Sequence, residues 1–186
     1  MNISEVSIEK HTLRYKKPIS TSHGSITERS VILLGLKDKK GTWGYGESSP
    51  LKGFSNENIN DVEKILAEWG KTKNEQSLTG SLTAKAAVDC AFLDLKAKNT
   101  GLPLHKFMNS KSLKEFPVSQ LILGENPEEL ASNALKATEA GYKTLKIKVG
   151  TSSEEIDYKR LKAVRETVGQ EIAIRIDANG GWDTNQ

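Results

Sequence analysis

Two lysines in one short apolar segment are the residues of this chain best suited to chemistry. Lys146 and Lys148 stand in residues 145–149, where charged and apolar side chains alternate as they do along a β-strand. Both lysines therefore share one face. Inward charges of this kind are costly unless they perform a task, and a desolvated lysine beside another cation becomes a usable general base. Taken alone, the pair is explained more simply by a half-exposed edge strand with solvated lysines.

The next expected strand carries an acidic side chain at its carboxyl end. In residues 174–179 the isoleucines point one way, whereas Arg175, Asp177 and Asn179 point the other way. Parallel α/β folds place their sites at this end of the strands, and a carboxylate there suits Mg²⁺, with Mn²⁺ as an alternative. An aspartate that only caps the following turn is the competing interpretation. The lysine pair on the neighbouring strand favours a site.

The elements that must position these residues alternate strictly from residue 116 onward. Strand, helix, strand, helix and strand with short loops indicate right-handed crossovers and a parallel sheet. The stretch from 116 to 186 is long enough for three strands and two helices. We expect strands over 118–123, 144–149 and 172–177, and helices over 126–140 and 154–168.

The preceding residues predict a separate α+β unit. Short strands and a hairpin turn at 38–41 come first, followed by helices over 58–69 and 81–98. The second helix is rich in alanine, which indicates close packing and a buried position for its cysteine, Cys90. Small polar residues at 20–25 predict a mobile loop. The expected domains are therefore 1–113, an α+β unit, and 114–186, the start of a parallel α/β unit.

Composition excludes several classes of function. The 186 residues are 36% hydrophobic and 27% charged, which is typical of a globular chain, and the net charge is only +3 with scattered lysines. Nucleic acid is therefore not an expected partner. A single cysteine excludes an internal disulfide, and no apolar run approaches the roughly 20 residues that span a bilayer. We expect a cytoplasmic protein that does not bind membranes.

Four motifs in order resemble the muconate-lactonizing branch of the enolase superfamily. They are Lys146-x-Lys148, Asp177-x-Asn179, the GYGESSPL run at 44–51 and the alanine-rich helix at 86–96. Within that branch, residues 49–55 and 177–182 are most similar to the o-succinylbenzoate synthases. The resemblance implies a metal-dependent lyase of menaquinone or phylloquinone biosynthesis that eliminates water from a small-molecule carboxylate. It also implies that 1–113 is an α+β capping domain and that 114–186 is the start of a TIM-like (β/α)₈ barrel. A complete barrel needs about 200 residues or more, so only its first three strands would be present and the barrel is incomplete. An oligomer is compatible with the resemblance.

The resemblance also implies roles for particular residues. Lys148 would take the proton α to the substrate carboxylate and return it to the departing hydroxyl group, and Lys146 would lower the pKa of Lys148. Asp177 would be the first of three carboxylate ligands to Mg²⁺, and Asn179 would lie beside the metal and the substrate. The stabilised anion carries its charge on two oxygens, which is the chemistry that a lysine base with Mg²⁺ serves.

Two capping segments, 20–26 and 51–54, would close over the substrate, and Ser22 and Phe54 would contact it. The family's remaining metal carboxylates and its opposite-face lysine lie on later strands. We therefore expect residues 1–186 alone to be inactive. Two alternatives stay open: a dipeptide epimerase with the same lysine pair, and a non-catalytic truncated homologue that acts as an interaction module.

Overall fold

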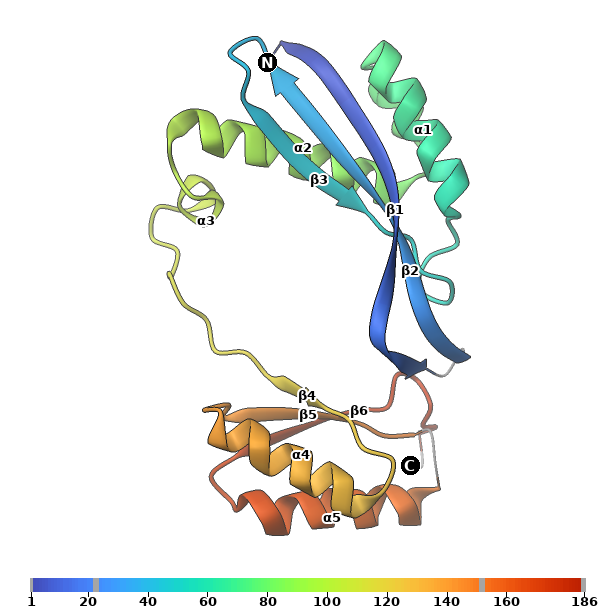
Figure 1. Cartoon of the computed structure of the whole chain (residues 1–186), viewed down its shortest axis with the longest axis vertical. Coiled ribbons are helices and arrows are strands. Elements are labelled where there is room, and N and C mark those ends of the chain that lie inside the picture. The colour runs from blue at the N-terminus through green and yellow to red at the C-terminus, as the bar shows by residue number, and fades with distance from the viewer. Residues whose placement is uncertain (1, 22–23, 151–152, 185–186) are drawn as a thin grey trace. The chain divides into compact units, whose positions relative to one another are not determined.

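The computed structural model describes residues 2–21, 24–150 and 153–184, and the chain forms two compact units, Met1–Lys114 and Glu115–Gln186. Its regular elements follow one another in the order strands, helices, then alternating strands and helices (Figure 1). They are β1 (Ile3–Thr21), β2 (Gly24–Asp38), β3 (Trp43–Ser48), α1 (Ile59–Thr72), the 3-10 helix η1 (Glu75–Leu78), α2 (Leu82–Thr100), α3 (Leu104–Met108), β4 (Gln120–Ile122), α4 (Pro127–Glu139), β5 (Thr144–Lys148), α5 (Glu154–Val168) and β6 (Ala173–Asp177).

The N-terminal unit is built on an antiparallel sheet in the order β1-β2-β3. Its first two strands are longer than the sequence predicts, since Ser20 pairs with Ser25 and Thr21 pairs with Gly24. The loop expected over 20–25 is therefore wrong for these four residues, and positions 22–23 lie outside the described residues. Small polar side chains misled the prediction, because antiparallel pairing uses backbone hydrogen bonds that need no apolar side chain.

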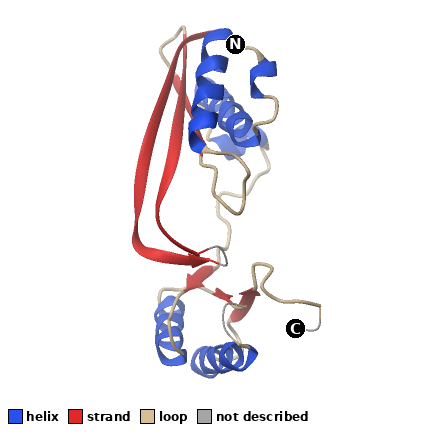
Figure 2. Ribbon diagram, turned by 90° about the vertical axis from the view of Figure 1, so that its right-hand side faces the viewer, coloured by secondary structure: helices blue, strands red, loops and turns tan. Residues whose placement is uncertain are grey.

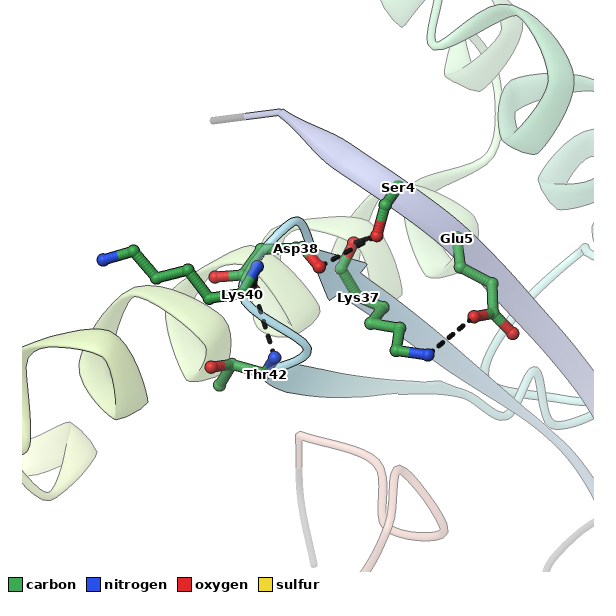
Figure 3. A network of polar contacts seen from close by, with 6 residues as sticks. All are labelled: Ser4, Glu5, Lys37, Asp38, Lys40 and Thr42. Carbon is green, nitrogen blue, oxygen red and sulfur yellow. Dashed lines mark hydrogen bonds and ion pairs between the residues drawn. The ribbon is translucent and has the colours of Figure 1, made fainter.

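The predicted turn at 38–41 is confirmed and joins β2 to β3. The buried Asp38 carboxylate accepts hydrogen bonds from the backbone N–H groups of Lys40 (2.8 Å) and Thr42 (3.0 Å). The Ser4 hydroxyl donates to the Asp38 carbonyl at 2.8 Å, which ties the turn to β1 (Figure 3). This network fixes the register of the three strands at one end of the sheet.

Helix α2 lies so close to β3 that the strand has no room for a side chain at Gly44 or Gly46. A Cβ atom on Gly46 would lie 1.9 Å from the Ala87 carbonyl oxygen, and one on Gly44 would lie 2.3 Å from that of Ala91. The glycines of the GYGES segment and the buried alanines of α2 therefore complement each other. Both long helices lie on the same side of the sheet (Figure 2).

Cys90 corrects the expectation of a buried thiol. The cysteine is exposed, whereas its neighbours Ala87, Val88 and Ala91 are buried. Successive side chains of an α-helix are turned by about 100°, so Cys90 points about 110° away from the middle of the face formed by Ala84, Ala87, Val88 and Ala91.

The C-terminal unit contains a parallel sheet in the order β4-β5-β6. Helices α4 and α5 cover one face of it (Figure 2), and a core formed by Leu130, Ala134, Leu145, Ile147 and Val164 fills the space between. The predicted fold class is confirmed: an α+β unit is followed by the first three parallel strands of an incomplete barrel. Strand β4 covers Gln120–Ile122 and is shorter than the predicted 118–123.

Both helices of this unit begin where the sequence indicates. The side chain of Asn126 accepts a hydrogen bond from Glu129 N and caps α4, and Ser153 caps α5 in the same way. Among the described residues, none of the helices is long and apolar enough to cross a membrane.

Candidate active site

The central strand β5 carries its two lysines on the face opposite to the helices. Leu145 and Ile147 are fully buried against α4 and α5, while Lys146 and Lys148 alternate with them and are partly exposed. The alternation expected from the sequence is therefore present. It leaves the two amino groups side by side along one strand, about two residues apart.

Asp177 at the end of β6 shares that face with the lysines. In the register of the two strands Lys148 lies opposite Asp177, and Lys146 Nζ forms an ion pair with Asp177 Oδ2 at 2.6 Å. The hydrogen bond from Lys146 lowers the pKa of the Asp177 carboxyl group, and the backbone N–H of Asn179 lowers it further. Asp177 is therefore ionised at neutral pH, as a metal ligand has to be.

Asn179 forms the turn that follows β6. Its backbone N–H donates to Asp177 Oδ1 at 3.0 Å, and its φ of 49° lies in the left-handed region that Asn tolerates. The turn-capping role that competed with a site is thus real. It occupies one carboxylate oxygen of Asp177, while Lys146 occupies the other.

The two predicted capping residues belong to the sequence of the N-terminal unit, not to the unit that carries Lys146, Lys148 and Asp177. Ser22 lies outside the described residues. Phe54 belongs to the N-terminal unit, in the segment between β3 and α1, and its side chain is 66% exposed. Their proposed contact with substrate rests on the family resemblance alone.

Sequence reasoning missed the contacts that hold the segment around Phe54. The Glu57 carboxylate accepts hydrogen bonds from the Ser81 hydroxyl and, at 3.1 Å, from Thr83 N at the start of α2. Ahead of this segment, Arg29 Nη2 donates to the carbonyl of Ser49 at 2.7 Å. These partners stand 20 to 26 positions apart in the chain, so no local spacing could have indicated them.

Asp177 fits a single position in the oxygen-ligand shell that Mg²⁺ prefers. Over the described ranges the structure contains no group of three or more His, Cys, Asp or Glu side chains that could hold a metal ion. The described residues can therefore contribute one ionised carboxylate toward a Mg²⁺ site, and they do not complete one.

Comparison with family models identifies both units. Residues 3–109 match the N-terminal domain of mandelate racemase and muconate lactonizing enzyme, and residues 129–186 match the enolase C-terminal domain-like family. This chain belongs to the mandelate racemase/muconate lactonizing enzyme family of the enolase superfamily. The enolase-superfamily membership predicted from Lys146-x-Lys148 and Asp177-x-Asn179 is therefore confirmed.

Similar proteins include racemases and epimerases and, at lower identity, chloromuconate cycloisomerases. The chain is 32% identical to the N-succinyl-L-Arg/Lys racemase of Bacillus cereus, over 98% of this chain and 53% of the relative. It is 29% identical to the D-Ala-D/L-Ala epimerase of Cytophaga hutchinsonii, with coverage of 98% and 53%. The chain thus spans about half the length of the curated relatives that it matches.

Solved structures agree with these relatives. The dipeptide epimerase of Enterococcus faecalis, complexed with Mg and the dipeptide L-Leu-L-Tyr, superimposes with a TM-score of 0.86 at 27% identity. The match covers 98% of this chain and 55% of that one. The finer expectation of an o-succinylbenzoate synthase finds no support among these proteins, which favour the alternative of a dipeptide epimerase.

Proposed function

We propose that the protein carrying this chain is a racemase or epimerase that removes and returns the proton on a carbon bonded to a carboxylate. The observation that carries the proposal is the shared face of β5 and β6, where Lys146, Lys148 and the ionised Asp177 meet at adjacent strands. Enzymes commonly place such groups at the carboxyl ends of parallel strands.

Lys148 would act as the general base. Lys148 is the last residue of β5 and lies opposite Asp177 in the register of the two strands. Lys146 lies two residues earlier in the same strand. Lys146 carries a positive charge that would attract the substrate carboxylate. Mg²⁺, when bound, would supply positive charge for the carboxylate oxygens of the substrate, and Asp177 would be one of its ligands.

The proposed substrate is a dipeptide or an N-acylated amino acid. Support comes from the relatives, which act on D-Ala-D/L-Ala and N-succinyl-L-Arg/Lys according to their names. Asn179, Ser22 and Phe54 are the proposed substrate-binding residues of this chain. Elimination of water, as in o-succinylbenzoate synthesis, would use the same base. The experiment therefore has to distinguish proton exchange from loss of water.

The test is proton exchange at the α-carbon, followed by ¹H NMR in D₂O. L-Ala-L-Glu and N-succinyl-L-arginine are incubated with Mg²⁺ and the protein from the longest natural reading frame that contains residues 1–186. The expected result is loss of the α-proton signal without loss of water from the substrate. Residues 1–186 assayed alone should give no exchange, because the part of the chain that the structure describes supplies one metal carboxylate only.

Lys148→Ala should lower the exchange rate by about 10²- to 10⁴-fold, the usual contribution of a general base. The matched control is Lys136→Ala, which removes an exposed lysine from α4 and should leave the rate unchanged. Exchange that survives Lys148→Ala would overturn the proposed role of Lys148. Absence of exchange with every substrate would favour the interaction-module alternative.

A further inference from the structure

A buried ion pair lies on α5, outside the groups that the proposed reaction uses. Arg160 Nη1 and Asp157 Oδ1 are 3.0 Å apart, and their side chains are only 11% and 3% exposed. The pair formed on the same helix by Lys159 and Glu155 is 62% and 75% exposed. Burial of two charges costs desolvation that their attraction barely offsets, so stability alone does not explain the buried pair.

Both partners also bind the backbone at the end of β5. Asp157 Oδ2 accepts a hydrogen bond from Gly150 N at 2.7 Å, and Arg160 Nη1 donates to the carbonyl of Lys148 at 3.3 Å. Between these two positions, Val149 N donates to the carbonyl of Asp177 at 3.0 Å. Three consecutive residues are thus held in place, the first of them being the proposed base.

The backbone conformation and close packing of Gly150 restrict the end of β5 further. Its φ of 76° lies in the left-handed region, and a Cβ atom there would lie 3.2 Å from Cδ1 of Trp182. The strand end is therefore packed against Trp182 from one side and bonded to Asp157 from the other. Arg160 Nε is buried and has no hydrogen-bond partner among the described residues, which fits a side chain placed for its backbone contact rather than for maximal bonding.

We propose that Asp157 and Arg160 are positioning residues that hold the end of β5, and with it Lys148, in fixed register with Asp177. The proposal rests on the proposed function in that it takes Lys148 to be the base. Rate depends steeply on such placement, since a displacement of about 1 Å can lower a rate about 100-fold. Neither residue touches the substrate in this scheme.

The test separates positioning from stability with a double variant of the 186-residue chain. Asp157→Leu/Arg160→Met removes both charges and retains most of the buried volume, so the fold should persist, as it does when buried pairs are replaced by apolar residues. Glu155→Leu/Lys159→Met makes matched changes in the exposed pair of the same helix. Amide hydrogen exchange and the side-chain ¹³C shifts of both lysines are measured by NMR.

The expected result for the double variant is an increase of about 10- to 100-fold in the exchange rate of the Gly150 amide, because that amide loses a charge-assisted hydrogen bond. Ile147 in the strand interior should keep its protection. The signals of Lys148 should move, while those of Lys146, held by its ion pair with Asp177, should not. The control variant should resemble wild type throughout.

Unchanged Gly150 exchange and unchanged Lys148 signals would overturn the proposal, whatever the enzymatic activity proves to be. If the double variant does not fold, Asp157→Asn removes the charge at constant size and gives the same readouts. Failure of the proposed function is seen separately, as absence of α-proton exchange in the longer protein. In an active protein, the double variant should lower kcat and leave KM nearly unchanged.

Discussion

Replacement of Gly46 by alanine tests the packing that defines the N-terminal unit. The new Cβ atom would lie 1.9 Å from the Ala87 carbonyl oxygen and 2.9 Å from Ala91 N. Carbon and oxygen atoms approach to about 3.3 Å in folded proteins, so α2 would have to retreat by about 1.4 Å. The clash is with helix backbone, which cannot rotate away as a side chain can.

Overpacking of this kind costs about 1–3 kcal/mol, and contact with backbone places Gly46→Ala at the upper end. Alanine recovers about 0.5–1 kcal/mol of backbone entropy, which leaves a net loss of about 2 kcal/mol in the free energy of unfolding. For a domain of about 100 residues, each kcal/mol lowers Tm by about 4–8 °C. The expected decrease in Tm is therefore about 8–16 °C for the N-terminal unit.

The assay is unfolding by urea and by heat, followed through tryptophan fluorescence. Trp43 and Trp69 report on the N-terminal unit, and Trp69 is fully buried there, whereas Trp182 reports on the C-terminal unit. Single replacements of the other tryptophans by phenylalanine separate the two transitions. Only the N-terminal transition should move.

Gly70→Ala is the matched control for this variant. Gly70 lies within α1, and its Cβ atom would meet Val6 Cγ1 at an ordinary contact distance of 3.4 Å. Because alanine favours helix, this change should raise stability by about 0.5–1 kcal/mol. If Gly46→Ala costs less than about 0.5 kcal/mol, or behaves like Gly70→Ala, the packing argument is refuted.

Three further predictions follow from the charged groups. Lys146→Met should raise the pKa of Asp177 toward its ordinary value in a ¹³C NMR titration, and an unchanged pKa would contradict this. The stabilisation from the depressed pKa is complete above the unfolded value near 3.8 and is lost as the pH falls through the lower folded pKa, so the variant should lose under about 1 kcal/mol at pH 7 and progressively less below pH 3.8. Burial raises the pKa of Glu57, but hydrogen bonds from Ser81 and Thr83 lower it more, so Glu57→Gln should lower the free energy of unfolding by about 1 kcal/mol at pH 7. Urea unfolding should show this difference from wild type disappearing as the pH falls well below 4.5. Treatment with EDTA should abolish α-proton exchange in the longer protein and Mg²⁺ should restore it, whereas exchange that persists without metal would remove Asp177 from the proposed ligands.

The features that could be read from the sequence are those set by a few neighbouring residues. Side chains alternate along any strand, so Lys146 and Lys148 had to share a face once 145–149 was recognised as a strand. The helix start at Asn126 followed equally from local capping chemistry. The two-part α+β and α/β organisation follows from the same local periodicities, taken in order along the chain, whereas the family followed from the resemblance of its motifs.

Tertiary structure decided which residues meet. The ion pair between Lys146 and Asp177 depends on the register of β5 against β6, and the exposure of Cys90 depends on which face of α2 contacts the sheet. The anchoring of the β5 end by Asp157 also required the path of the chain from strand to helix. Local backbone geometry specifies the direction of a side chain within its own element, but its partner depends on how distant elements pack, and no short segment of sequence contains that information.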